Sequence, residues 1–418
     1  MPHAPLRIVA VSLHTSPLAE PGDADAGGMN VVVLEQSRAL ARAGHQVDLF
    51  TRRSDPDAPD VVDVADGLRV HHLTAGPAAP LAKSAMEQAI RPFRDQLRER
   101  LTPSADHAPH WDLIHSHHWF SGVAALPVAR ELGLHHLQSF HSVAAPQEAA
   151  SLDAGEPAES AGRIPGERFC AQESDLVVAV SAAEARTVAE RYQVPGERLT
   201  VVRPGVDVEL FHPGASQPAR GAEHASRPSS PTLLFAARLQ PLKAPDLAIE
   251  VLSRLDPELD ARLVLTGGVS EDFADYPQQL TALAQELGVA DRIELVGPRG
   301  RDDLAHLMRD ADLLLLTSWS ETFGLVALEA QASGTPVIAW SGAGGVREAV
   351  APGGIVLGSR DPDVWAEAVQ SLLASTDTLA DAGRQARSFA VGRSWDDSAS
   401  ALATQYARLT TTRRNDDR

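Results

Sequence analysis

The chain has 418 residues, enough for two or three globular domains, and its 44% hydrophobic and 22% charged residues are ordinary for a folded protein. Its 56 acidic residues outnumber its 37 basic residues, which gives a formal net charge of −19 at pH 7. This charge disfavours binding to nucleic acid and to anionic membranes, so small molecules are the partners we expect.

Short apolar runs alternate with amphipathic stretches along the first half of the chain. Runs rich in Val, Ile and Leu are typical of parallel strands that helices cover on both faces. We therefore expect helices in most of the gaps. The predicted strands cover Leu6–Leu13, Gln46–Thr51, Leu68–Leu73, Asp112–Ser116, His135–Phe140, Asp175–Ser181 and Leu199–Val202.

The alternating pattern stops after Phe211 and begins again at Thr232. The intervening segment, Pro213–Pro231, is rich in Pro, Ser, Ala and Gly and has no apolar period, which predicts a linker. The second series of predicted strands covers Thr232–Arg238, Ala261–Thr266, Arg292–Val296, Ala311–Thr317, Thr335–Ser341 and Gly354–Leu357.

The two series predict an α/β fold of two Rossmann-like domains that face each other across a cleft. The ligand site is expected where the carboxyl ends of their strands meet. A long loop over Val143–Gly166 is also predicted, and loops of this length are often functional. We assign residues 1–212 to an N-terminal domain, 213–231 to the linker, 232–393 to a C-terminal domain, and 394–418 to a helix that packs back on the N-terminal domain.

Paired glycines, Gly27 and Gly28, end the long loop after the first strand, where a helical pattern starts. They let a bound group approach free backbone N–H groups at the positive end of a helix, which suits an anion. The loop is neither a P-loop nor a GxGxxG turn, so an ordinary flexible turn is the alternative.

Two carboxylates lie around a predicted strand-to-helix turn in SWSETFGLVALEAQASGTPVIA, residues 318–339. Glu321 is in the loop, the helix starts near Phe323 and Gly324, and Glu329 lies about two turns into it. A carboxylate in this position can accept two hydrogen bonds from a vicinal diol such as ribose. The alternative is a capping role for Glu321 and a solvated Glu329.

Two cations lie at the end of the first strand of the second series. Arg238 ends that strand and Lys243 follows it, just before a predicted helix. Cations at this edge of a sheet can hold a diphosphate without a metal ion. Simple surface solvation is the alternative.

Histidines follow two strands of the first series, in HSHHWFSG (residues 115–122) and SFHSV (residues 139–143). No HExxH motif or ligand-spaced quartet is present, so we expect no metal and interpret His118 and His141 as hydrogen-bond donors lining the cleft. No GxSxG elbow or nucleophile-and-base pattern is present either. The single cysteine, Cys170, excludes an intramolecular disulfide and is expected to be a buried packing residue.

The segments HTSPLAEPGDADAGGMNV, RLQPLKAPD and ETFGLVALEAQASGTPV together resemble the retaining nucleotide-sugar glycosyltransferases of two-Rossmann (GT-B) architecture. Glu321 and Glu329 correspond to the Glu-x7-Glu motif of that family, and the resemblance covers nearly the whole chain. These segments look especially like those of the actinobacterial enzymes that transfer N-acetylglucosamine to inositol 3-phosphate in mycothiol biosynthesis. The resemblance implies transfer of a sugar, with retained anomeric configuration, from a nucleotide diphosphate-sugar to a small-molecule acceptor, with no cofactor.

The resemblance also implies roles for single residues. The Gly28 region, Arg238 and Lys243 would hold the donor diphosphate. Glu329 would bind the ribose hydroxyls, Glu321 the donor sugar, and His141 the sugar from the N-terminal side. The implied catalytic residues are His141, Arg238, Lys243 and Glu321. The implied donor-binding residues are Gly27, Gly28, Arg238, Lys243, Arg299, Glu321, Phe323, Gly324, Leu325 and Glu329.

Four residues that hold the acceptor phosphate in the mycothiol enzymes, a lysine, a tyrosine, a threonine and an arginine, match Lys83, His118, Ser142 and Arg163 here. Asn30 is assigned to the same acceptor site. Imidazole still donates a hydrogen bond and serine keeps the hydroxyl, yet two of the four positions are changed.

The changed positions slightly favour a paralogue recruited to antibiotic metabolism, such as the lincosamide S-glycosyltransferases, which use a GDP-octose donor and ergothioneine. Transfer from UDP-N-acetylglucosamine to inositol 3-phosphate stays open, as does a non-transferring epimerase or binding protein. The first residues run directly into a strand without signal-peptide features, so we expect a cytoplasmic location. A homodimer is also left open.

Overall fold

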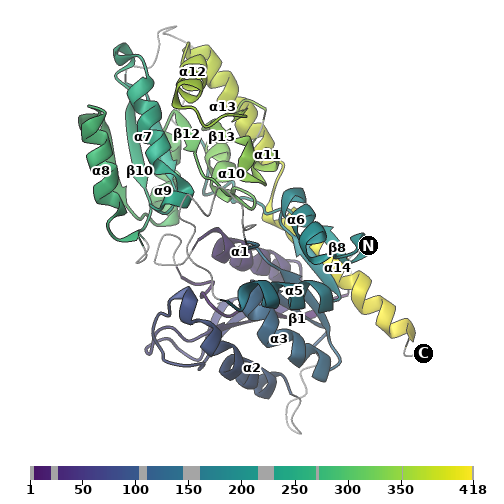
Figure 1. Ribbon diagram of the computed structural model, residues 1–418. Coiled ribbons are helices and arrows are strands. Elements are labelled where there is room, and N and C mark those ends of the chain that lie inside the picture. The colour runs from purple at the N-terminus through teal and green to yellow at the C-terminus, as the bar shows by residue number, and fades with distance from the viewer. Residues whose placement is uncertain are drawn as a thin grey trace.

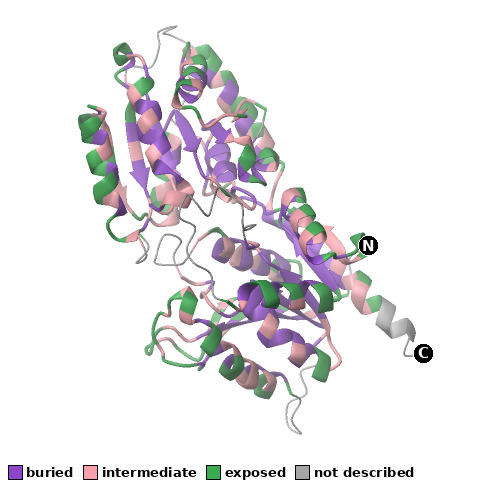
Figure 2. Cartoon of the chain, viewed as in Figure 1, coloured by how far each residue is buried: buried purple, intermediate pink, exposed green. Residues whose placement is uncertain are grey.

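Two parallel sheets organise the chain in the computed structural model, which describes residues 4–19, 27–102, 111–144, 161–214, 230–269, 273–350 and 352–416, with side chains up to residue 411. Figure 1 shows the two sheets in separate domains, and Figure 2 shows that their strands are largely buried between helices. The predicted fold of two Rossmann-like α/β domains is confirmed.

The first sheet has, in the described part of the chain, the strand order β3-β4-β2-β1-β5-β6-β7-β8, and its pairs are parallel except for β3 with β4. The helices on its two faces lie between these strands in sequence. Its strands are β1 (Arg7–Ser12), β2 (Gln46–Arg52), β3 (Val61–Ala65), β4 (Leu68–Leu73), β5 (Leu113–His117), β6 (His135–Ser139), β7 (Leu176–Ala179) and β8 (Leu199–Val201). The helices of this domain are α1 (Gly28–Arg42), α2 (Glu87–Leu101), α3 (Trp119–Glu131), α5 (Arg163–Glu173) and α6 (Ala182–Tyr192).

The second sheet is parallel, and its described strands follow the order β11-β10-β9-β12-β13-β14. These strands are β9 (Thr232–Ala236), β10 (Arg262–Thr266), β11 (Ile293–Gly297), β12 (Leu313–Leu316), β13 (Val337–Trp340) and β14 (Ile355–Leu357). The helices are α7 (Pro245–Arg254), α8 (Tyr276–Glu286), α9 (Arg301–Asp310), α10 (Leu325–Ala332), α11 (Val346–Ala349), α12 (Pro362–Leu372), α13 (Thr376–Val391) and α14 (Trp395–Asp416).

Helix α14 follows the C-terminal domain in sequence but packs against α1 of the N-terminal domain (Figure 1). Trp395, Leu402 and Tyr406 share one apolar cluster with β1 residues such as Ile8. Gln36 of α1 also donates a hydrogen bond to Ser398 Oγ at 3.0 Å. One face of the first sheet is therefore covered by two helices that are far apart in the sequence.

The segments that connect the two domains run side by side. The backbone N–H of Val206 donates to the carbonyl of Arg393 at 2.9 Å, and Val206 forms an isolated bridge with Ser394. A Cβ on Gly205 would lie 2.4 Å from the Ser394 carbonyl carbon, so only glycine fits this close approach.

The structure differs from the predicted elements at two places. Strand β3 was not predicted, although its sequence VVDVA is apolar at four of its five residues; it is a short edge strand that pairs, among the described strands, only with β4. Helix α5 begins at Arg163, inside the segment predicted as the loop Val143–Gly166. The helix starts there because buried contacts of Arg163 and Glu167, which a local composition signal does not carry, stabilise its first turn.

Most of the predicted linker, residues 215–229, lies outside the described residues, as does the part of the predicted long loop over residues 145–160. Among the helices that the structure describes, none combines the length and apolar character needed to cross a bilayer.

Candidate functional site

Oppositely charged side chains meet where β9 and β12 end. Lys243, in the turn after β9, places its Nζ 2.6 Å from Glu321 Oε1 in the loop after β12. Ser318 Oγ donates to the same carboxylate oxygen at 2.8 Å. An ammonium group has three donors, so Lys243 can keep Glu321 and still donate to a bound diphosphate.

The turn that carries Lys243 is fixed by the neighbouring strand. Thr317, at the end of β12, donates its hydroxyl to the carbonyls of Lys243 at 3.0 Å and Ala244 at 2.7 Å. Ala244 is in the left-handed region with a φ of 50° and is the N-cap residue of α7. A strained residue held by several contacts is typical of a functional turn. Arg238 lies half-buried at the start of the same connection.

The loop that carries Glu321 is braced against the segment after β13. The N–H of Glu321 donates to Ala343 O at 2.6 Å, and Gly345 donates back to Glu321 O at 2.9 Å. A Cβ on Gly345 would lie 2.1 Å from Thr322 O. The close backbone contact therefore holds Glu321 in place independently of any ligand.

Glu329 lies on α10 and is paired with an arginine that the sequence analysis did not identify. Arg301 Nη1, at the start of α9, is 3.1 Å from Glu329 Oε1. Burial raises the pKa of the Glu329 carboxyl, and Arg301 opposes this shift. Arg299, the predicted donor-site arginine, is exposed and donates to Pro298 O at 3.1 Å. Arg301 is thus the cation in contact with the proposed ribose-binding carboxylate.

The first turns of two helices from different domains converge beside these charges. A Cβ on Gly28, the first residue of α1, would lie 4.0 Å from the Cβ of Leu325, the first residue of α10. Gly27 precedes α1, and Gly324 precedes α10 with a φ of 98°, which favours glycine. Phe323, before it, is buried. Two positive helix ends at one place provide a field that suits an anion.

Two histidines from the N-terminal domain are held in the left-handed region at the carboxyl ends of their strands. His118 follows β5 with a φ of 70°, and His141 follows β6 with a φ of 59°. His141 Nε2 lies 2.9 Å from His117 Nδ1 at the end of β5, which fixes its ring. Strain of this kind is stored mostly at functional sites.

Two cations lie within electrostatic range of the neighbouring histidines. Burial, followed by the charges of Lys83 and other groups, lowers the pKa of His14 to about 3. Burial and the same cations, Lys83 and Arg163 among them, hold the pKa of His118 well below its usual value. The Nδ1 atoms of His14 and His118 have no hydrogen-bond partner within the described part of the chain. Neutral rings beside positive charges suit an anionic ligand that also carries hydroxyl groups.

Arg163 connects the acceptor-side residues. Its Nη2 donates to Ser142 Oγ at 3.3 Å, and its Nε donates to Glu167 Oε1 at 2.7 Å. Asn30 lies on α1 and donates to Thr15 Oγ1 at 2.9 Å, while its own Oδ1 is buried without a partner among the described residues.

The histidine-rich strand ends carry no cluster typical of a metal site. In the ranges that the structure describes, no group of three or more His, Cys, Asp or Glu side chains is placed to hold a metal ion. His115 instead contacts Tyr406 Oη at 2.7 Å and Ser139 Oγ at 3.0 Å. Cys170 is buried, and burial raises the pKa of its thiol.

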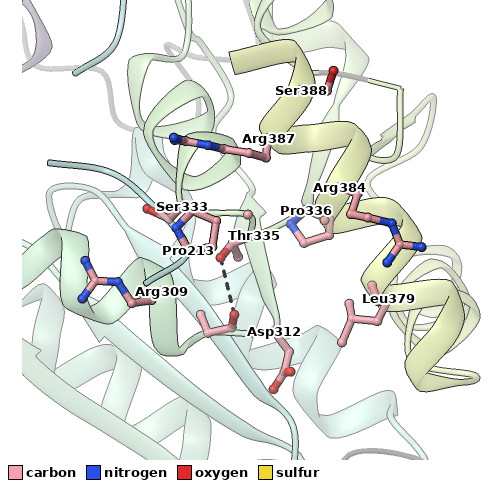
Figure 3. Close-up of a pocket in the computed structure, with 14 residues that line it drawn as sticks. Pro213, Arg309, Asp312, Ser333, Thr335, Pro336, Leu379, Arg384, Arg387 and Ser388 are labelled. Carbon is pink, nitrogen blue, oxygen red and sulfur yellow. Dashed lines mark hydrogen bonds between the residues drawn. The ribbon is translucent and has the colours of Figure 1, made fainter. Parts of the chain in front are cut away.

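A pocket of about 450 Å³ lies elsewhere, at the amino ends of β12 and β13 (Figure 3). Asp312, Thr335 and Pro336 line it together with residues of α13. Arg387 donates hydrogen bonds to the carbonyls of Phe211 and Ala332. This pocket is at the end of the strands opposite to Glu321, so we do not assign it to the donor site.

Contacts between the domains join the two halves of the site. Ser181 Oγ donates to Thr322 O, beside Glu321, at 2.7 Å. Glu348 Oε1 accepts from the N–H of Ala182 at 2.6 Å, and its other oxygen lies 2.7 Å from Arg203 Nε. Residues of both domains therefore contact the loop that carries Glu321.

The structure brings the predicted residues together in two groups, with Arg299 turned away. Of the predicted donor residues, Lys243 and Glu321 lie together beside the two helix starts. Of the predicted acceptor residues, Lys83 and Arg163 lie within electrostatic range of His118, and Arg163 contacts Ser142. The sequence analysis did not single out His14, His117, Glu167, Arg301 or Ser318. Arg301 meets Glu329 across 28 positions of the chain, a contact that no local pattern signals. His14, His117 and Ser318 lie within segments quoted above and could have been found by their position after a strand.

Comparisons with protein families agree with this arrangement. Residues 217–389 match the family described as glycosyl transferases group 1, and residues 26–210 match glycosyltransferase family 4. The two matches cover the C-terminal and N-terminal domains in turn.

Curated relatives and solved structures match the chain over nearly its full length. D-inositol 3-phosphate glycosyltransferases of Stackebrandtia nassauensis and Nocardiopsis dassonvillei are each 39% identical, over 96% and 98% of this chain and 91% and 96% of theirs. Sucrose-phosphate synthase of Thermosynechococcus elongatus superimposes with a TM-score of 0.84 at 26% identity, over 97% of this chain and all of that one. Anabaena HepE in complex with UDP and glucose, at 19% identity over 96% of this chain and 99% of that one, shares the fold with a TM-score of 0.71. The chain therefore belongs to the group 1 glycosyltransferases of GT-B architecture.

Proposed function

We propose that this glycosyltransferase moves a sugar from a nucleotide diphosphate-sugar, with retention at the anomeric carbon, to a small acceptor that carries a phosphate or carboxylate group. The observation that carries the proposal is the presence of two groups of charged residues in one molecule. The first group consists of Lys243 and Glu321 beside two helix starts. The second consists of Lys83 and Arg163 beside neutral histidines. No observation favours an epimerase or a non-catalytic binding protein, since the family is one of transferases.

The chemistry follows from the charges. The bond from the anomeric carbon to the diphosphate oxygen breaks, and the acceptor atom bonds to the same face of that carbon. The acceptor proton passes to the departing diphosphate. Arg238, Lys243 and the helix N-termini stabilise the developing negative charge, a contribution of about 10² to 10³ in rate for one such donor.

Inositol 3-phosphate is one candidate acceptor. It is the substrate in the names of the curated relatives, and Lys83 and Arg163 provide two cations for a phosphate. Ser142 Oγ accepts a hydrogen bond from Arg163 at 3.3 Å, and its own hydroxyl hydrogen would donate to the same phosphate.

A thione metabolite such as ergothioneine is the second candidate, within a lincosamide-type antibiotic pathway and with a GDP-linked donor. His118 and Ser142 stand where the mycothiol enzymes have tyrosine and threonine, and changes at buried polar contacts can alter discrimination by about 10⁴. Ergothioneine carries a carboxylate, so the same two cations can bind it.

Two measurements on the purified protein distinguish these candidates. Thermal shifts with UDP and GDP identify the nucleotide, because a ligand of the folded state raises the melting temperature. Turnover of UDP-N-acetylglucosamine with inositol 3-phosphate, and none with inositol, would support the first candidate and exclude the second. Lys83→Ala is expected to raise the acceptor KM at least tenfold, because the variant loses a charge-assisted hydrogen bond to the acceptor.

The proposal also covers the metal requirement, the cellular location and the oligomeric state. Transfer is expected to need no divalent metal, because Arg238, Lys243 and the helix starts already supply positive charge. Activity after exhaustive chelation checks this, and complete loss that magnesium or manganese restores would contradict it. We also propose a cytoplasmic location and leave a homodimer to measurement by light scattering.

A further inference from the structure

A buried carboxylate with no assigned role lies directly behind the acceptor-side residues. Glu167, on α5, is fully buried, and its side chain meets three segments of the N-terminal domain. Its Oε1 accepts from Arg163 Nε at 2.7 Å, and the N–H of Ala144 lies 3.1 Å from Oε1 and 3.2 Å from Oε2. Tyr192 of α6 donates its hydroxyl to Oε2.

These bonds determine how Arg163 is presented. An arginine side chain has many rotamers, and the bond from Nε to Glu167 selects one of them. The terminal nitrogens then face the other way, and Nη2 reaches Ser142 Oγ. Arg163 and Glu167 are one helical turn apart on α5, and both are buried, so few other rotamers are open to either side chain.

The remaining bonds of Glu167 fix the surrounding backbone. Its contact with the N–H of Ala144 holds the segment that carries His141 and Ser142. The Tyr192 hydroxyl ties the carboxylate to α6. A buried ion pair with all its bonds satisfied favours one geometry over others.

We propose that Glu167 is a positioning residue that orients Arg163 and the 141–144 segment for the acceptor anion. This inference rests on the proposed function, in which Arg163 contacts the acceptor. Glu167 does not touch the acceptor itself, so its substitution is expected to change acceptor binding and to leave donor binding unchanged.

The test compares Glu167→Gln with Tyr192→Phe, which removes one hydroxyl and nothing else. Glu173→Gln is the matched control, because Glu173 lies on the same helix and pairs with Arg130 at the surface. Titration calorimetry measures the affinity for inositol 3-phosphate, for ergothioneine and for the nucleotide diphosphate. Glu167→Gln is expected to weaken acceptor binding at least tenfold, Tyr192→Phe to weaken it less, and Glu173→Gln to change nothing.

A second comparison separates this inference from the proposed function. Arg163→Ala should weaken acceptor binding, and adding Glu167→Gln to it should weaken binding no further, because the two residues act as a unit. If the wild type binds neither acceptor, or Arg163→Ala binds as the wild type does, the proposed function fails. If Arg163→Ala weakens binding while Glu167→Gln and Tyr192→Phe do not, the inference alone fails. Should Glu167→Gln not fold, Tyr192→Phe still decides.

Discussion

Single charged residues of the donor side are paired with each other in the structure. Lys243 forms an ion pair with Glu321, and Arg301 forms an ion pair with Glu329. Each cation is thereby oriented, and each carboxylate keeps further lone pairs for hydroxyl groups. Two predictions concern the residues on this side of the site.

The first concerns the diphosphate. Arg238→Ala and Lys243→Ala are each expected to weaken binding of the nucleotide diphosphate about 10- to 100-fold, since a charge-assisted bond contributes about 1.5–3 kcal/mol. Titration calorimetry measures the affinity. Arg254→Ala, which removes an exposed arginine of α7 paired with Asp363, is the control and should bind normally. Unchanged affinity in both test variants would remove the proposed diphosphate site.

The second concerns the ribose. If Glu329 accepts hydrogen bonds from the ribose hydroxyls, the wild type should bind the nucleotide more tightly than its 2′,3′-dideoxy analogue. Glu329→Gln is expected to lose most of that preference, because an amide has one acceptor oxygen and no charge. A preference that survives in Glu329→Gln would assign the ribose to other groups.

At the scale of elements, the loop after β12 depends on close backbone contacts. Gly345→Ala would place a Cβ 2.1 Å from Thr322 O, so the loop that carries Glu321 must shift. We expect a loss of about 1–3 kcal/mol in the free energy of unfolding and weaker nucleotide binding. Gly358→Ala is the control, because its Cβ would meet no atom within 4 Å. Wild-type nucleotide affinity in Gly345→Ala would show that this contact does not position Glu321.

The elements were largely predictable because apolar runs and turn residues are local signals. The parallel strands and the starts of α1 and α10 could be predicted from such runs. Strand β3, with the sequence VVDVA, carries the same local signal and was missed. The start of α5 could not be predicted, because it depends on the Arg163–Glu167 pair. Arg301 was missed for the same reason, since only the tertiary fold brings it to Glu329.

At the scale of the whole molecule, the N-terminal domain contains several buried neutral histidines. Burial is the largest cause of the lowered pKa in each of them. The pKa falls to about 3 for His14, His115 and His136, to about 4 for His141, and well below the usual value for His117 and His118. Glu184 opposes them, because burial raises its pKa to about 7.

These shifts predict a steep loss of stability in acid. Below about pH 6.5 these histidines bind protons in the unfolded chain but stay neutral in the folded protein. As the pH falls, the free energy of unfolding therefore decreases by up to about 1.4 kcal/mol per pH unit for each histidine. Glu184 acts with the opposite sign between about pH 4.5 and 7, and the histidines outweigh it. Urea unfolding between pH 7.5 and 5.5 measures the slope.

One variant tests the origin of that slope. Between pH 7.5 and 5.5, His136→Gln should reduce the mean slope by about 0.7 kcal/mol per pH unit, because an imidazole of pKa about 6.5 is on average half-protonated in the unfolded chain over this range and the buried site no longer takes up a proton on unfolding. Equal slopes in the wild type and in His136→Gln would contradict the assignment to buried histidines.

The packing of α14 against α1 also determines when, during synthesis of the chain, the core of the N-terminal domain can be completed. Trp395, Leu402 and Tyr406 belong to the core that contains Ile8, yet they are synthesised only after the whole C-terminal domain. On the ribosome, the part of this sheet face that α14 covers must therefore stay exposed after α1 has packed, until the second domain has been synthesised. The domain that begins the chain is the last to complete its core.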